Sequence, residues 1–472
     1  MSAILHDLLV GLSLVMLVYF VAIQALMFVL AIGSAIVLHR EQAIERFGRV
    51  EDMLTSSLAP PVSLVIPAYN ESAGIVDVVH SMSMASYPRL EIVVANDGST
   101  DDTLAKLIEA FEMIQVPYPL RSVIPSAPVR AVYKSTLPID LTVIDKENGG
   151  RADALNAAIN AARYPYVMAT DADVLIDGHA LAHAMRLIAE DRDRTVAVGG
   201  NIRPLNGCSI RLGHVVQAAV PDSLLARYQI LEYVRAFVSS RPAWGAINCL
   251  PLISGAFGIF RRDTLVELGG YTPGHLGEDL DLTMRIHRHY RESKTPYRIG
   301  YSPAAVVWTE VPATRAIFRR QRIRWHRGLM TAVHDFRSSF LNPRHGAVGM
   351  LLWPAQVLFE YLAPIVEFAG YVVIPIALWV GAVSPITVGV AFLMALFLGS
   401  LTSLLGLLID ERFGYFNDPL ETLKLLGLVF VENLGLRQMT VWWRIRAMLG
   451  GRSTRVWGNM ERRGVSRLAN SH

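Results

Sequence analysis

The sequence predicts an α/β domain with a mostly parallel sheet, flanked by transmembrane and interfacial helices. Short apolar runs alternate with helical segments from residue 62 onward, which is the pattern of strands joined by helical crossovers. The 472 residues are 52% apolar and only 18% charged, which is too apolar for an ordinary soluble protein. Because the apolar residues are concentrated near the two ends of the chain, we expect a membrane-associated region on each side of the domain.

The first apolar segment predicts a transmembrane helix over residues 1–40. Residues 8–38 contain no Asp, Glu, Lys or Arg and are long enough to cross a bilayer with some tilt. His39 and Arg40 follow this run, where a signal peptide would end in small residues and a cleavage site. We therefore expect the helix to be retained.

Residues 336–450 are predicted to form a second membrane region with two kinds of helix. Residues 369–409 carry no formal charge and are divided by Gly-Ala-Val-Ser-Pro at 381–385, which predicts a transmembrane hairpin. Residues 346–366 and 421–441 are apolar but interrupted by prolines or charged residues, which is more typical of interfacial helices.

Basic residues predict the orientation of the chain. The domain at 41–335 follows His39 and Arg40, and the tail at 451–472 is rich in arginine, so both are expected in the cytoplasm. One span before the domain and two after it satisfy this arrangement, with the N-terminus outside. The protein is therefore expected to be a multi-pass protein of the cell (inner) membrane. The alternative is that 346–366 and 421–441 both span the membrane. This adds two crossings and leaves the domain and the tail on the same side.

The elements of the domain follow in order from apolar runs and helix-start signals. Strands are predicted at 62–66, 90–95, 141–144, 166–169, 196–199 and 258–260. Helices are predicted near 72–81, after a Ser-Thr cap at 99–100, following the stretch at 146–156, around 222–238 and from 277. The proline-bearing stretch at 116–138 matches no element.

Two carboxylates, Asp171 and Asp173, stand just after the strand predicted at 166–169. In open α/β sheets, ligands bind at the carboxyl ends of the strands. Two carboxylates so close repel each other unless a cation lies between them, and hard oxygen ligands favour Mg²⁺ or Mn²⁺. A polar turn that caps a strand gives the same local pattern. The motif therefore indicates a metal site only together with the other motifs of the chain.

Two further clusters have a structural interpretation beside a functional one. The acidic residues of Gly-Glu-Asp-Leu-Asp at 277–281 stabilise a helix N-terminus by themselves. The basic run at 319–327, which contains Trp325, equally fits a collar at anionic lipid headgroups. Both clusters are also candidates for a catalytic site.

Six motifs occur in one order and together resemble the membrane-integrated family 2 glycosyltransferases. They are Pro-Ala-Tyr-Asn-Glu at 67–71, Asn-Asp-Gly-Ser-Thr-Asp at 96–101, Asn-Gly-Gly-Arg-Ala-Asp-Ala-Leu-Asn at 148–156, Asp-Ala-Asp at 171–173, Gly-Glu-Asp at 277–279 and Gln-Arg-Ile-Arg-Trp at 321–325. The last motif resembles the processive synthases of cellulose, hyaluronan, chitin oligosaccharides and poly-N-acetylglucosamine. The resemblance covers residues 62–328 and implies a GT-A-type (Rossmann-like) cytoplasmic glycosyltransferase domain at 41–335.

This resemblance implies a nucleotide-sugar donor, with Mg²⁺ or Mn²⁺ held by Asp173 and positioned with Asp171. Departure of a diphosphate builds negative charge, which such a cation stabilises. Gln321 and Arg324 would contact the diphosphate or close over it. By the same resemblance, Asp97 would hydrogen-bond uracil. The rest of the nucleotide pocket would comprise Ala68, Tyr69, Glu71 and Arg151.

The resemblance also implies the acceptor side of the reaction. Asp279 matches the family's general base, which takes the proton of the attacking hydroxyl. Trp325 would stack on the terminal acceptor sugar, and residues 254–256 resemble the segment that lines the acceptor site. Gly277 stands where the synthases commonly have threonine. A single displacement would invert an α-linked donor and give a β-linkage.

These implications predict an inverting, metal-dependent, processive glycosyltransferase that polymerises a β-linked polysaccharide and passes it across the membrane. Expected partners are a UDP-sugar (UDP-glucose or UDP-N-acetylglucosamine), the growing polysaccharide, the lipid bilayer and accessory subunits, and no nucleic acid. Candidate residues for a polar path by which the polymer crosses the membrane are Glu360, Glu367, Glu432 and Asn433. One alternative is a non-processive family 2 enzyme that moves one sugar to polyprenyl phosphate or another lipid. A second alternative is a catalytically silent membrane scaffold.

Overall fold

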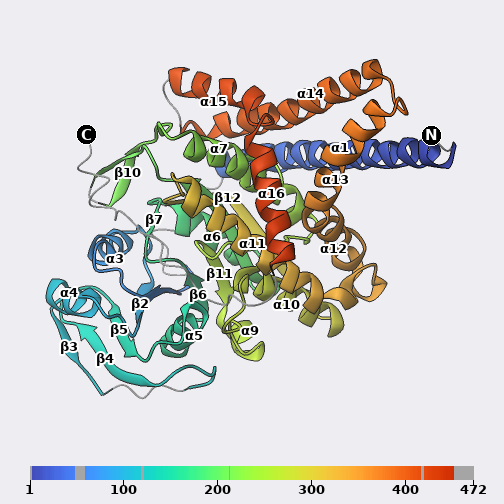
Figure 1. Ribbon diagram of the computed structural model, residues 1–472. Coiled ribbons are helices and arrows are strands. Elements are labelled where there is room, and N and C mark those ends of the chain that lie inside the picture. Colours follow the sequence, from blue (N-terminus) through green and yellow to red (C-terminus); the bar gives the residue numbers. More distant parts are fainter. Residues whose placement is uncertain (1–2, 48–58, 118–121, 212, 416–418, 451–472) are drawn as a thin grey trace.

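A ten-stranded mixed sheet forms the centre of the molecule, and long apolar helices project from one side of it (Figure 1). The computed structural model describes residues 3–47, 59–117, 122–211, 213–415 and 419–450. The predicted basic tail at 451–472 lies outside the described residues. The strand order across the sheet is β3-β4-β5-β2-β1-β6-β11-β8-β12-β7.

Four neighbouring parallel strands carry the first half of the domain: β5 (Leu141–Lys146), β2 (Leu90–Asp97), β1 (Val62–Ala68) and β6 (Tyr166–Ala169). Most of their side chains are buried, as expected for parallel strands with helices on both faces. β1 and β2 end at nearly the same level, because Ala68 pairs with Asn96, whereas β6 ends three residues earlier, because its last residue, Ala169, pairs with Val65. The loops that follow these strands therefore share one edge of the sheet.

The expectation of a mostly parallel sheet is wrong for the second half of the domain. β11 (Gly258–Arg261) runs antiparallel between β6 and β8 (Thr195–Pro204). Both edges of the sheet are antiparallel as well, formed by β4 (Val129–Ser135) with β3 (Met113–Gln115) and by β7 (Val174–Ile176). The pairings of β11 and β7 join segments that are far apart in the sequence, so no local pattern reports them.

β12 (Arg298–Thr309), which was not among the predicted strands, lies parallel to β8. Pro303 falls inside this strand, and proline cannot donate a hydrogen bond to a sheet ladder. The structure accommodates it by a register shift between Ser302 and Val306, so the strand bulges around the proline. A separate two-stranded sheet is formed by β9 (Ser209–Arg211) and β10 (His214–Gln217).

Helices cover both faces of the sheet and create two hydrophobic cores. On one face pack α3 (Ile75–Ser83), α4 (Thr103–Ala110) and α6 (Ala180–Glu190). On the other face pack α5 (Arg151–Ala161) and α10 (Glu278–Glu292). Shorter helices are α8 (Arg241–Ala246), α9 (Arg262–Glu267) and α12 (Trp353–Gln356).

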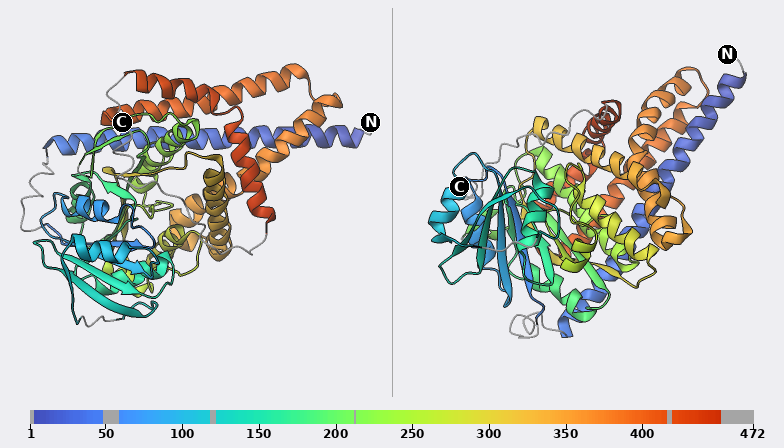
Figure 2. Two further views of the ribbon diagram at one scale, coloured as in Figure 1. Left: turned by 60° about the vertical axis from the view of Figure 1, so that its left-hand side comes forward. Right: turned by 90° about the horizontal axis from the view of Figure 1, so that it is seen from below.

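Two helices of the described chain are long and apolar enough to cross a bilayer. They are Ala3–Glu41, within α1 (Ala3–Phe47), and Pro385–Phe413, which begins with α14 (Pro385–Asp410). A third candidate span is the pair Val348–Tyr361 and Ala363–Trp379 (α13), bent by 41° at the break. α1, α13 and α14 lie together and extend away from the sheet domain (Figure 2).

α13 begins at Ala363, ahead of the charge-free run that starts at residue 369 and that predicted the hairpin. The helix therefore includes Glu367, whose two carboxylate oxygens accept hydrogen bonds of 3.0 and 2.7 Å from Arg437. This bidentate partner neutralises the charge that set the predicted boundary.

The C-terminal helices return to the sheet domain. α16 (Leu436–Leu449) packs along α11 (Arg315–Asp335), and α15 (Pro419–Val431) packs on α14 and on α7 (Leu224–Tyr233). The segment at 421–441, predicted as one interfacial helix, is thus divided between α15 and α16.

A buried ion pair anchors the end of α14 to the sheet. Arg203 of β8 donates to Asp410 of α14, and both side chains are almost fully buried. The Arg203 guanidinium also lies 3.7 Å from the ring centroid of Tyr415. β12 pairs with β8 on one side and on the other with β7, which begins just after Asp173, so a single strand separates the anchor of the membrane region from the strand that follows the carboxylate loop.

Candidate active site

The loops after β1 and β2 are tied together at the carboxyl edge of the sheet. The Asn70 N–H donates to Ser99 Oγ (3.0 Å), and the Thr100 N–H donates back to Asn70 Oδ1 (2.8 Å). Ala68 ends β1 as a buried residue, whereas Tyr69 is 45% exposed beside it. The loop that contains Ala68, Tyr69 and Glu71 therefore lies next to the strand that ends with Asp97, as the predicted nucleotide pocket would require.

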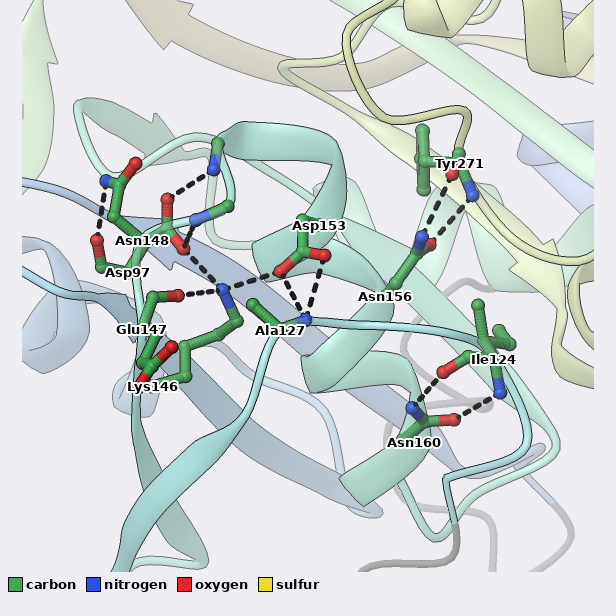
Figure 3. A network of polar contacts seen from close by, with 12 residues as sticks. Asp97, Ile124, Ala127, Lys146, Glu147, Asn148, Asp153, Asn156, Asn160 and Tyr271 are labelled. Carbon is green, nitrogen blue, oxygen red and sulfur yellow. Dashed lines mark hydrogen bonds and ion pairs between the residues drawn. The ribbon is translucent and has the colours of Figure 1, made fainter.

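Asp97 is buried, and its carboxylate has three protein partners. Its carboxylate accepts hydrogen bonds from Lys146 Nζ (2.5 Å), the Gly149 N–H (3.0 Å) and the Gly150 N–H (2.8 Å) (Figure 3). In this arrangement Asp97 supports the loop that opens α5. Its contact with uracil stays a prediction, because a base would have to share or replace one of these donors.

Asp171 and Asp173 lie between β6 and β7, at the same edge. Asp171 Oδ1 accepts a hydrogen bond of 2.7 Å from Arg151 Nε. Among the described residues, no third His, Cys, Asp or Glu side chain joins them in a metal-binding group. Hard carboxylate oxygens still fit Mg²⁺ or Mn²⁺, provided that a diphosphate and water supply the remaining ligands, as is usual for Mg²⁺.

Arg151, the first residue of α5, connects three parts of the site. Besides Asp171, its guanidinium donates to Glu278 Oε1 (2.8 Å) and to the Gly255 carbonyl (2.9 Å). Burial lowers the pKa of Arg151, but Asp171 and Glu278 outweigh this effect and raise the pKa overall. Nucleotide contact by Arg151 stays a prediction, whereas its bridge between the carboxylate loop, the acceptor segment at 254–256 and α10 is a structural fact.

Asp279 lies in the first turn of α10, next to Glu278. Burial and the neighbouring Glu278 charge raise the pKa of Asp279, and Arg151 partly opposes the rise. A carboxylate with a raised pKa is a stronger base, which suits the predicted role. The sequence analysis assigned no role to Glu278, although its place beside Asp279 in an acidic helix turn is the signal that identifies it.

α11 presents Gln321, Arg324 and Trp325 on one face, at the i, i+3 and i+4 spacing. Arg324 interacts electrostatically with Glu278, Asp171 and Asp279, so α11 faces the acidic cluster. Gln321 is 7% exposed, and its buried amide oxygen has no hydrogen-bond partner among the described residues. Such an atom is normally completed by a ligand or a water, and it supports a binding role for Gln321.

Trp325 is 41% exposed at the end of this face, and the Arg322 guanidinium lies 4.5 Å from its ring centroid. An exposed indole at the end of this face fits the predicted sugar platform. The structure thus brings Asp171, Arg151, Asp279 and Arg324 together, with Trp325 at the rim.

Comparisons with known proteins agree with this geometry. A family model described as "Glycosyltransferase like family 2" matches residues 60–328. Proteins named poly-β-1,6-N-acetyl-D-glucosamine synthase from Staphylococcus aureus (strain COL) and Staphylococcus epidermidis are each 30% identical, over 60% and 57% of this chain. The matches cover 58% and 54% of those relatives, so the chain spans little more than half of their length.

The solved structure of the mannosyltransferase PcManGT from Pyrobaculum calidifontis, in complex with GDP-Man and Mn²⁺, shares the fold. Its TM-score is 0.51 at 21% identity, and the alignment covers 89% of this chain and 99% of that one. The predicted GT-A-like fold is therefore confirmed. Because the family 2 model covers more than half of the chain, including every motif of the site, this protein belongs to the family 2 glycosyltransferases.

Proposed function

We propose that the protein is an inverting, metal-dependent, processive glycosyltransferase that polymerises a β-linked polysaccharide from a UDP-sugar at the cytoplasmic membrane face. The observation that carries this proposal is the meeting of the Gln321-Arg324-Trp325 face of α11 with Asp279, Glu278 and Arg151. The names of the staphylococcal relatives favour UDP-N-acetylglucosamine over UDP-glucose as the donor.

Asp279 is the proposed general base. The acceptor hydroxyl gives its proton to the Asp279 carboxylate as its oxygen attacks the anomeric carbon, and the bond to the diphosphate breaks on the opposite side. The attack inverts the anomeric centre and gives the β-linkage. The raised pKa of Asp279 increases its driving force as a base near neutral pH.

Asp173, with Asp171, is proposed to hold Mg²⁺ or Mn²⁺, which would stabilise the charge of the departing diphosphate. Arg324 would bring a permanent positive charge to the same group, and Arg151 keeps Asp171 oriented. A chelator should stop transfer, and added Mg²⁺ or Mn²⁺ should restore it. Asp173→Asn should stay inactive at every concentration of either ion, while donor transfer that persists in chelator would remove the metal from this proposal.

Processive synthesis requires an acceptor platform and an exit. Trp325 is the proposed platform. The exit would run between the C-terminal helices, where acidic side chains are held by arginines: Glu360 by Arg444 (3.6 Å), Glu367 by Arg437 (2.7 Å) and Glu432 by Arg235 (2.6 Å). The two clear spans, together with the bent pair crossing as one span, would supply the three crossings that the proposed cytoplasmic orientation of the domain requires.

The test is incorporation of radiolabelled sugar by membranes that contain the protein, supplied in turn with UDP-N-acetylglucosamine and UDP-glucose. We expect label from UDP-N-acetylglucosamine in a polymer that resists extraction by organic solvent. Label only in the organic phase would instead indicate transfer of one sugar to a lipid. No label above an Asp279→Asn control from either donor would reject the proposed donors.

A further inference from the structure

α5 carries a row of buried polar side chains, Asp153, Asn156 and Asn160, on an otherwise alanine-rich helix. Burying such groups costs free energy unless each one is hydrogen-bonded. All three bond to other segments rather than to α5 itself, and Figure 3 shows them in line along one side of the helix. Since an apolar side chain would avoid this cost, the row indicates that α5 holds defined segments in place.

Asn156 holds the segment that leads into α10. Its Nδ2 donates to the Tyr271 carbonyl (2.9 Å), and its Oδ1 accepts from the Tyr271 N–H (2.8 Å), so the amide pairs with the backbone as a strand would. Asn156 is only 1% exposed. The approach requires Gly270, which has φ +74°, because a Cβ there would overlap the Asn156 side-chain oxygen.

The same segment is held from α10 itself. Thr272 Oγ1 donates to Asp281 Oδ2 (2.6 Å), and Arg285 donates to that oxygen (2.9 Å) and to the carbonyls of Leu268 (2.9 Å) and Gly270 (2.7 Å). Residues 268–272 therefore connect the middle of α5 to the first turns of α10. A change in the Asn156–Tyr271 pair would therefore act on a segment that is bonded to the helix carrying Asp279.

Tyr271 also reaches the catalytic groups with its side chain. The buried phenol interacts electrostatically with Arg151, Asp279 and Glu278. Arg151, at the start of α5, contacts Asp171 and Glu278 directly. α5 thus contacts the loop of Asp171 and Asp173 through Arg151, and the segment 268–272 through Asn156.

We propose that Asn156 is a positioning residue, which acts through Tyr271 to fix Asp279 relative to the carboxylate loop of Asp171 and Asp173. This inference rests on the proposed transferase function. Asn156 touches neither substrate, so its loss displaces the base without removing a donor contact. A displacement of about 1 Å at a reacting group typically costs on the order of 100-fold in rate.

The chain offers a matched control on the same helix. Asn160 pairs in the same way with the backbone of Ile124, donating to its carbonyl (2.7 Å) and accepting from its N–H (2.9 Å). That pair holds a segment ahead of β4, and no catalytic group is part of it. The Ile124 side chain packs beside Gly270 but, being apolar, forms no hydrogen bond with residues 268–272. Asn156→Ala and Asn160→Ala therefore remove the same kind of buried interaction, with similar expected losses of thermal stability.

The experiment uses the full-length protein in membranes or detergent and measures UDP-binding stoichiometry, melting temperature, donor KM and kcat per binding-competent molecule. We expect Asn156→Ala to lower kcat by roughly 10–100-fold with donor KM nearly unchanged. Asn160→Ala should keep the wild-type kcat at a similar melting temperature. Thr272→Val, an isosteric change on the other side of the same segment, should also lower kcat.

Equal kcat values in the Asn156 and Asn160 variants would overturn the positioning role and leave the proposed function intact. If Asn156→Ala yields no UDP-binding protein, Thr272→Val decides: a wild-type kcat there overturns the inference, and a reduced kcat with unchanged donor KM supports it. A wild-type protein that transfers no sugar from either UDP-sugar would instead contradict the proposed function, and the inference with it.

Discussion

Gly277 and Gly328 bring the backbones of α10 and α11 into contact. A Cβ on Gly328 would stand 3.0 Å from both the N and the Cα of Gly277, and a Cβ on Gly277 would stand 3.3 Å from the Gly328 Cα. This close approach lets Arg324 reach the acidic first turn of α10. It also gives a physical reason for glycine at position 277, since a side chain there would press on α11.

Gly328→Ala should therefore lower sugar transfer. The added methyl meets backbone atoms, which cannot rotate away, so α11 must shift and carry Gln321 and Arg324 with it. We expect a loss of about tenfold or more in turnover. Gly427→Ala in α15 is the control, because a Cβ there meets nothing within 4 Å. Both changes gain about 1 kcal/mol of intrinsic helix propensity, so equal activity of the two variants would rule out the helix contact as a determinant.

Asp279→Asn and Asp281→Asn should distinguish the catalytic role of Asp279 from the structural role of Asp281. Asp279→Asn removes the proton acceptor and should lower turnover by about 10²–10⁴-fold with UDP binding kept. Asp281 is buried and bonded to Thr272 and Arg285, so Asp281→Asn should cost about 1–3 kcal/mol of stability and reduce turnover less. Turnover and thermal unfolding of both variants provide the check. Near wild-type polymerisation by Asp279→Asn would show that another group is the base.

The pH dependence of turnover should report the neighbours of Asp279. Burial and Glu278 raise its pKa, and Arg151 opposes them, so the base loses its proton only above the usual carboxyl range. Glu278→Gln removes a negative charge and should move the acid limb of kcat to lower pH. Glu292→Gln, at the other end of α10, should leave the limb in place. A limb that stays fixed in Glu278→Gln would show that a different group titrates.

The raised pKa of Asp279 also predicts that Asp279→Asn, which lowers turnover, increases the stability of the fold at neutral pH. Because the raised pKa means that the folded state binds the Asp279 proton more tightly than the unfolded state, stability falls as pH rises through that pKa. Asp279→Asn removes this buried charge and should raise the melting temperature at neutral pH. A lower melting temperature at neutral pH would contradict the burial argument.

Trp325 and Arg324 should differ in which reaction they support. Trp325→Ala should reduce polymer elongation more than hydrolysis of the UDP-sugar by water, since only elongation uses the sugar platform. Arg324→Ala should reduce both reactions, because both must stabilise the departing diphosphate. Parallel assays of polymer and of free sugar measure the split. Equal losses of the two reactions in Trp325→Ala would identify the indole as a membrane-interface anchor.

The parts of the fold that local patterns encode were predictable. Asp171 and Asp173 follow β6 as expected, because an uninterrupted apolar run ends where the carboxylates begin. β12 escaped prediction because Pro303 breaks its run, and the antiparallel placement of β11 depends on pairings with no local signal. The bridge from Arg151 to Glu278 joins residues 127 positions apart, so only the folded chain reveals it. Lys146 is similarly unexpected, since its charge is fully buried between Asp97 and Asp153.

Processive synthesis from a UDP-sugar is the central claim, and the size of the product at early times tests it most directly. Purified protein in lipid would receive labelled UDP-N-acetylglucosamine and an excess of acceptor, and products would be sized after only a small fraction of the donor is used. The account predicts long β-linked chains beside unused acceptor, absent in Asp279→Asn. Products that carry a single added sugar, at every time and donor concentration, would contradict it.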